Sequence, residues 1–105
     1  MAEAARKTDR SHCPNDSHGN PCCPHDVIGP ATEGSDDVFI NGLEALRLGD
    51  KGEHAECCGP NEWECDHGSD TVFINGKPAV RKGDVTKHCG GVGEIVDGSD
   101  NVFIG

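Results

Sequence analysis

The sequence predicts a small all-β protein in which three hairpin units surround a pseudo-threefold axis. Three observations support this fold class. One segment occurs three times, an Asn-Gly pair follows two of its copies, and no stretch has the apolar spacing of an amphipathic helix. The copies share Gly-Ser-Asp, one variable residue and Val-Phe-Ile. With the residues that follow Ile included, they occupy residues 34–42, 68–76 and 98–105.

Each unit is expected to be a turn followed by two short strands. Gly-Ser-Asp forms the turn, Val-Phe-Ile forms the first strand, and Asn-Gly is the strongest two-residue hairpin signal. Side chains alternate along a strand, so the Val and Ile side chains should share one face and Phe should lie on the other. The second strand reads Ala-x-Arg-x-Gly-Asp and occupies residues 45–50 and 79–84.

The second half of the third unit stands at the other end of the chain. Residues 4–9 read Ala-Ala-Arg-Lys-Thr-Asp, whereas nothing follows the third copy at Gly105. A closed ring of three units requires this permutation, and an open solenoid does not. We therefore expect a ring in which the two termini are adjacent.

The segments between the hairpins carry every Cys and His. They cover residues 10–33, 51–67 and 85–97, and they hold seven Cys and six His. Only 33% of the chain is hydrophobic, so a domain of 105 residues needs a further source of stability.

Seven cysteines cannot all pair within one chain, and no apolar leader is visible. We expect a reducing cytoplasm at synthesis, where Cys clusters more often bind metal than form disulfides.

The charge balance excludes two classes of partner. Nine Lys and Arg stand against 19 Asp and Glu, a formal net charge of −10. Binding to nucleic acid or to an anionic membrane surface depends on basic side chains. We therefore expect no nucleic acid partner and no stable membrane association.

Several motifs, in order along the chain, resemble the PAAR-repeat family, which is named after a Pro-Ala-Ala-Arg element. That element resembles Glu3-Ala4-Ala5-Arg6, Glu44-Ala45-Leu46-Arg47 and Pro78-Ala79-Val80-Arg81. The resemblance extends to His12-Cys13-Pro14, Pro24-His25, Gly29-Pro30, Cys57-Cys58-Gly59-Pro60 and His88-Cys89-Gly90-Gly91. In one departure, Thr8-Asp9 stands where the family has Gly-Asp.

The resemblance implies a small conical fold with one structural zinc ion that staples the loops near the apex. Such proteins sit as monomers on a homotrimeric spike of the VgrG type or the phage central-spike type. They cap and sharpen that spike in type VI secretion systems, phage tails and related contractile injection machines, and they aid membrane puncture. We expect residues 1–105 to form a single domain with no C-terminal effector extension, and effector proteins are further candidate partners. The protein would be cytoplasmic during assembly and would then lie at the tip, to be delivered outside the cell.

Carried over by position, the resemblance implies the zinc ligands His12, His25, Cys57 and His88. The internal repeat gives a rival set, because Cys13 and His54 lie four residues beyond an Asp, as His88 does. In that set Cys13 replaces His12, and His54 is the ligand of the middle loop.

The remaining Cys and His match no ligand position. We expect His18 and His67 to be solvated, and Cys65 to be a small buried hydrophobe, because Ala31 and Ile95 hold its equivalent positions. Four thiols stay open between packing, a disulfide and a second metal: Cys22, Cys23, Cys58 and Cys89.

The recurring Arg and Asp of the Ala-x-Arg-x-Gly-Asp element are expected to form structural ion pairs or to line a docking face.

We expect the protein not to be an enzyme, since the chain has no His-Glu-x-x-His, no nucleophilic triad spacing and no phosphate loop. The alternative is a small metal-binding or redox storage module unrelated to a spike.

Overall fold

The computed structural model describes residues 2–16, 25–53, 62–88 and 91–105, with side chains except at 14–16 and 25–27. These residues form strands, turns and connecting segments, with no helix among them, as expected for an all-β protein. The hairpin strands are β1 (Ala2–Glu3), β4 (Phe39–Ile40), β5 (Leu43–Glu44), β8 (Phe73–Ile74), β9 (Lys77–Pro78) and β12 (Phe103–Ile104). The longer strands are β2 (Arg10–Asp16), β3 (His25–Pro30), β6 (Lys51–Glu53), β7 (Glu62–Cys65), β10 (Val85–His88) and β11 (Val92–Ile95).

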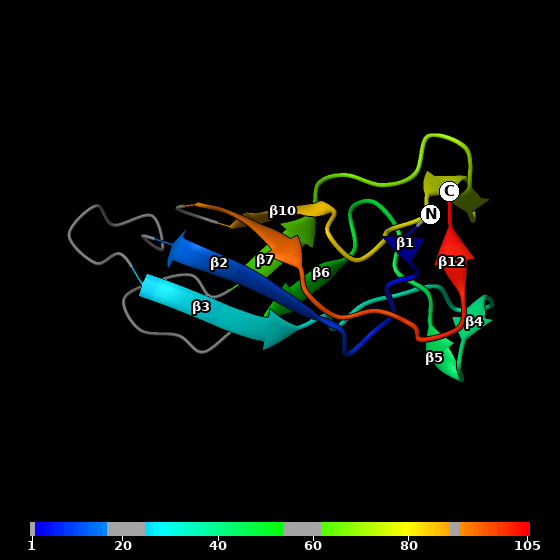
Figure 1. Ribbon diagram of the computed structural model, residues 1–105, viewed down its shortest axis with the longest axis horizontal. Coiled ribbons are helices and arrows are strands. Elements are labelled where there is room, and N and C mark those ends of the chain that lie inside the picture. Colours follow the sequence, from blue (N-terminus) through cyan, green and yellow to red (C-terminus); the bar gives the residue numbers. More distant parts are fainter. Residues whose placement is uncertain (1, 17–24, 54–61, 89–90) are drawn as a thin grey trace.

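Three two-stranded sheets lie together at one end of the molecule (Figure 1), which we call the hairpin end. Two of them, β4–β5 and β8–β9, turn through Asn41-Gly42 and Asn75-Gly76, and all four turn residues have positive φ. This is the type I′ turn that Asn-Gly predicts. The third sheet pairs β1 with β12 through Ala2↔Ile104, so the termini are adjacent as expected.

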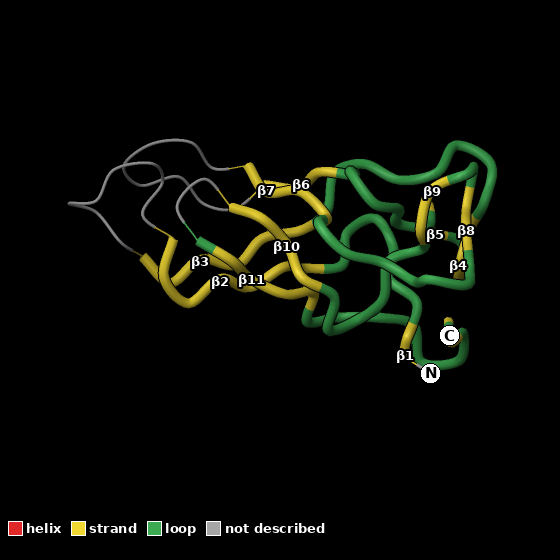
Figure 2. Tube along the Cα trace, turned by 90° about the horizontal axis from the view of Figure 1, so that it is seen from above, coloured by secondary structure: helices red, strands yellow, loops and turns green. Residues whose placement is uncertain are grey.

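The longer strands form a six-stranded antiparallel sheet in the order β3-β2-β11-β10-β7-β6 (Figure 2). Its outer strands approach each other, since Ala31 and Gly52 form a bridge between them. The sheet is therefore nearly closed on itself, and we call it the barrel.

A ring of three backbone hydrogen bonds separates the barrel from the hairpin end. Ala5 N donates to Val80 O, Val80 N donates to Leu46 O, and Leu46 N donates to Ala5 O, at 3.0–3.1 Å. Each of these residues follows a buried Ala, and neighbouring side chains in extended chain point to opposite sides. The ring therefore has one small core on each side.

The barrel core contains Ala5, Ala31, Leu46, Trp63, Cys65, Val80 and Ile95. The core of the hairpin end contains Ala4, Ile40, Ala45, Ile74, Ala79 and Ile104. Cys65 is 1% exposed and lies with Ala31 and Ile95, which confirms the interpretation of this thiol as a buried hydrophobe. Burial raises the pKa of the Cys65 thiol, so the thiolate form is disfavoured.

Trp63 fills the barrel beside Gly52. A Cβ placed on Gly52 would lie 2.2 Å from Trp63 Cζ2, so only glycine leaves room for the indole there. The indole is 1% exposed, the largest fully buried side chain among the described residues.

The recurring Arg and Asp form the same ion pair three times. In each, the carboxylate accepts bonds from the main-chain N and the guanidinium of the Arg three residues earlier: Arg6–Asp9, Arg47–Asp50 and Arg81–Asp84. The structural ion-pair interpretation is therefore confirmed. At the turn within each element, Thr8 has φ +82, where Gly49 and Gly83 have φ +89 and +92. The family departure at Thr8 thus places a β-branched residue in a left-handed conformation that favours glycine.

Candidate functional site

At the barrel end away from the hairpins, Cys13 and His88 occupy matching inward positions. Each lies four residues beyond the Asp of an ion pair, and they are 0% and 4% exposed. His12 is half-buried, whereas its neighbours Ser11 and Cys13 are buried, as strand alternation requires. The repeat-based prediction that Cys13 and His88 are equivalent therefore agrees with their burial.

The other predicted ligands are less fully described. His25 begins β3 and pairs in register with Asp16, and its side chain lies outside the described part. Cys57 and the alternative ligand His54 lie outside the described residues altogether, as do His18 and the four open thiols. Among the residues that are described, no three metal-binding side chains converge. The four-ligand set therefore stays a prediction.

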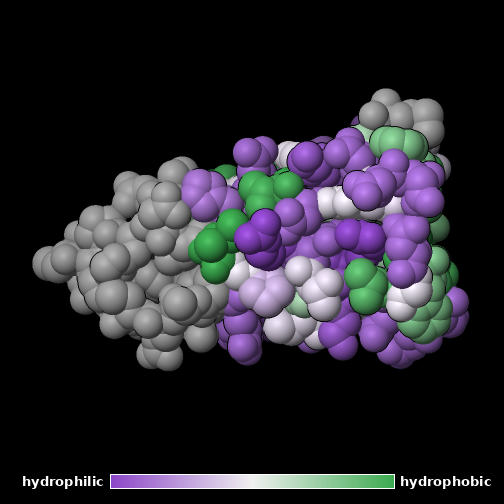
Figure 3. All heavy atoms as spheres, turned by 60° about the horizontal axis from the view of Figure 1, so that its bottom comes forward, coloured by the Kyte–Doolittle hydropathy of each residue, from purple (hydrophilic) through white to green (hydrophobic). Residues whose placement is uncertain are grey.

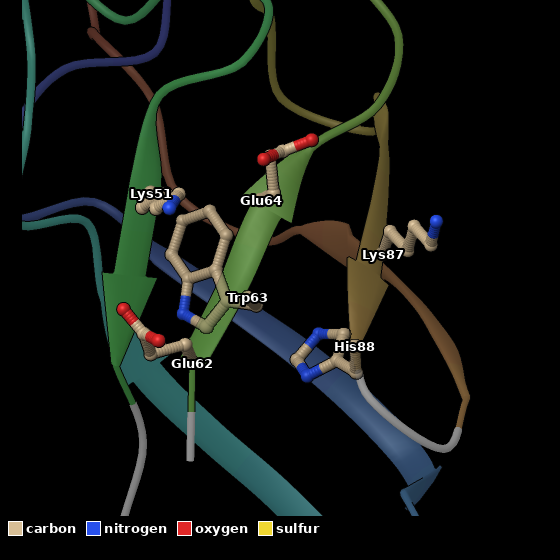
Figure 4. Close-up of a pocket in the computed structure, with 6 residues that line it drawn as sticks. All are labelled: Lys51, Glu62, Trp63, Glu64, Lys87 and His88. Atoms are coloured by element: carbon tan, nitrogen blue, oxygen red, sulfur yellow. The ribbon is translucent and has the colours of Figure 1, made fainter. Parts of the chain in front are cut away.

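His88 packs against a polar pair inside the barrel. Its Nε2 lies 3.1 Å from Ser11 Oγ and 3.2 Å from Thr86 Oγ1, and the two hydroxyls are 2.6 Å apart. The imidazole also stacks on Trp63, with ring centroids 6.4 Å apart (Figure 4). Ser11 and Thr86 are both 0% exposed.

The pocket beside His88 has walls of alternating charge. It is lined by Lys51, Glu62, Trp63, Glu64, Lys87 and His88 (Figure 4). Glu64 lies opposite Lys51 on one neighbouring strand and opposite Lys87 on the other, so opposite charges face each other across the sheet. This arrangement stabilises the sheet.

His67, predicted to be solvated, is on the surface. Its side chain is 58% exposed, and Nδ1 lies 3.3 Å from Asp84 Oδ1. It therefore faces the Arg81–Asp84 ion pair of the scaffold.

At the hairpin end, β4, β8 and β12 are edge strands. Their partner strands are bound on both sides, because Glu44 O, Pro78 O and Glu3 O accept bonds from Lys7 N, Leu48 N and Lys82 N. Among the described residues, each edge strand has a backbone partner on one side only. Three strand edges are thus available for pairing.

One Phe lies on each edge strand. In a two-residue hairpin the residues flanking the turn bond to each other, so the next residue outward directs its N–H and C=O to the free edge. That residue is Phe39 in β4 and Phe73 in β8, and Phe103 holds the same place in β12. The three side chains are 56%, 57% and 46% exposed, on a surface that is otherwise mostly hydrophilic (Figure 3).

The repeated Ser and Asn do more than form turns, and this role was not predicted. Each buried Ser of a Gly-Ser-Asp turn donates its hydroxyl to the residue after Ile in another unit: Ser35 to Asn75, Ser99 to Asn41 and Ser69 to the main-chain oxygen of Gly105. The same acceptors bind Arg47, Arg6 and Arg81. These bonds hold the three edge strands in fixed relative positions. The signal in the sequence was the recurrence of both residue types at fixed spacing.

A comparison with protein families identifies the family of this chain. Residues 2–60, more than half of the chain, match the PAAR motif family. The chain belongs to the PAAR motif family. No curated protein matches it at a significant level.

Membership in the PAAR family confirms the expectation that the chain is structural and non-enzymatic. The family implies a conical fold and a place at the tip of an injection apparatus, on a VgrG-type spike. PAAR proteins often bind zinc. Among the described residues, no helix is long and apolar enough to cross a membrane.

Proposed function

We propose that this PAAR protein caps a trimeric spike of a contractile injection machine and sharpens it for membrane puncture. The observation that carries the proposal is the presence of three edge strands that each present a Phe and free backbone groups. One chain therefore offers three equivalent docking edges, and a homotrimer offers three equivalent subunits. In this proposal residues 1–105 form one conical domain whose three units surround the spike axis.

Pairing of strand edges explains the choice of partner. A β-helical spike ends in strands whose outer edges have no partner, and such edges pair readily with an added strand. The exposed Phe rings would pack beside the side chains of the neighbouring spike strands, as cross-strand pairs do within a sheet. The edges β4, β8 and β12 of this chain would thus be covered together with those of the spike.

A single structural zinc at the opposite end fits the donor types that are described there. Cys and His are the ligands that zinc prefers, and Cys13 and His88 lie buried at matching positions of β2 and β10. The family resemblance gives His12, His25, Cys57 and His88 as the ligands, and the repeat gives Cys13, His54 and His88. The shared inward position supports Cys13, and His88 belongs to both sets. Zinc would link strands of different units at an end where the apolar core is small.

The protein would act at the tip of the apparatus after assembly in the cytoplasm, with effector proteins as further candidate partners. A type VI secretion system and a phage-type tail are both compatible with this role. The rival storage module would need many free thiols, and packing of Cys65 in the core removes one of them.

Mixing the purified chain with a trimeric VgrG-type or central-spike protein from the same genome tests the function. We expect the two proteins to elute together from a size-exclusion column at micromolar concentration. A spike of unrelated origin serves as the control. Separate elution from every trimeric spike encoded beside the chain would contradict the proposal.

A further inference from the structure

The barrel contains a buried polar group that the repeat does not require. Ser11, Gly52 and Thr86 hold equivalent places, two residues beyond the Asp of each ion pair. At Gly52 the space is taken by the Trp63 indole, so the scaffold can form without a hydroxyl at this position. Burying two hydroxyls costs free energy unless they are hydrogen-bonded, which points to a specific use for Ser11 and Thr86.

That use involves His88. The two hydroxyls and Nε2 lie within 3.2 Å of one another, and all three residues are buried. Gly93 leaves room for the ring, because a Cβ there would lie 2.9 Å from His88 Nε2. The imidazole is therefore held between the hydroxyls, the Trp63 ring and a glycine.

We propose that Ser11 and Thr86 are positioning residues that hold His88 so that Nδ1 is its metal-binding atom. Two hydroxyl oxygens enclose Nε2 in the barrel, so a metal ion has no access to that nitrogen. The two ring nitrogens of an imidazole point in divergent directions, as Figure 4 shows for His88. A metal ion on Nδ1 requires the neutral ring to carry its proton on Nε2, and in that tautomer the hydroxyl oxygens accept the Nε2–H bond.

This inference rests on the zinc site of the proposed function, and it assigns an atom and two supporting residues that the ligand set does not contain. Residues that orient a ligating His are usually worth a factor of about 10–100 in metal affinity. The hydroxyls therefore have a measurable effect that a purely structural pair would not have.

The test compares zinc affinity in matched variants of the full chain. Ser11→Ala combined with Thr86→Val removes both hydroxyls with little change of volume. Ser35→Ala combined with Ser69→Ala removes two equally buried hydroxyls at the hairpin end and controls for lost stability. Affinity is measured by competition with a chromophoric chelator, and we expect a loss of about 10–100-fold in the first variant and less than about threefold in the control.

A second measurement needs no substitution. Long-range proton–nitrogen NMR of the ¹⁵N-labelled chain reports which nitrogen of His88 carries the proton and which one binds zinc. We expect Nε2–H in the zinc-free and the zinc-bound chain, and zinc on Nδ1.

Two outcomes overturn the inference alone: unchanged affinity after removal of both hydroxyls, or zinc on Nε2 of His88. If the unaltered chain binds no zinc, the inference falls together with the metal part of the proposed function. Spike binding is measured separately, so failure of the docking proposal is recognised by itself.

Discussion

Replacing Phe39, Phe73 and Phe103 together by Ser is expected to abolish co-elution with the trimeric spike at micromolar concentration. The three rings are about half exposed in the free chain, so their loss removes little folding free energy. In the complex they would be covered, and buried aromatic residues at the centre of an interface commonly carry about 2 kcal/mol or more each. Even with strong non-additivity, we expect binding at least about 100-fold weaker.

A matched control uses apolar residues that are equally exposed elsewhere. Ile28, Val85 and Val92 lie on barrel strands and are 44%, 39% and 66% exposed. Their simultaneous change to Ser removes comparable apolar surface away from the edge strands. Binding is measured by titration calorimetry, and circular dichroism verifies that both variants are folded. Equal loss of binding in the two variants would contradict docking through the hairpin end.

Trp63→Ala is expected to be the most destabilising single substitution among the described residues. The indole fills the barrel core against Gly52 and stacks on His88. Truncation of a buried aromatic ring costs about 3–5 kcal/mol, because the cavity left behind collapses only in part. A domain of this size has a total stability of about 5–15 kcal/mol, so a large share would be lost.

Thermal unfolding followed by circular dichroism measures this effect. We expect the melting temperature to fall by roughly 15–30 °C. Phe73→Ala is the control, since it removes an aromatic ring that is 57% exposed and should change the stability by less than about 0.5 kcal/mol. A shift of only a few degrees for Trp63→Ala would show that the barrel does not depend on this residue.

The hairpin end was predictable because its signals are local. Asn-Gly requires two positive φ angles, and Asn41-Gly42 and Asn75-Gly76 adopt them. The permuted third unit predicted the pairing of the two termini, which Ala2↔Ile104 confirms. Equivalence with Ala31 and Ile95 was enough to place Cys65 in the core.

The barrel interior was not predictable in the same way, because its contacts join side chains of different strands and a position in the repeat does not specify them. Ser11, Thr86 and His88 meet across strands from different units, and strand alternation alone does not say which inward residues touch. Trp63 occupies space that Gly52 leaves on the paired strand β6. Thr8 adopts the left-handed turn of Gly49 and Gly83 although Thr disfavours it, since the ion pair beside it recurs in all three units.

The zinc ligands follow only in part from the sequence pattern and the fold. The family resemblance and the repeat agree on His88 and differ between His12 and Cys13, and burial supports Cys13. His25, Cys57 and His54 stay predictions.

The stoichiometry of the spike complex tests the central claim most directly, because three edges on one chain must meet three subunits. Native mass spectrometry of the co-eluting complex gives this ratio without any substitution. The account predicts one chain per spike trimer at every excess of the chain. Three chains per trimer would contradict it, since each chain would then use a single edge and would not cap the spike axis.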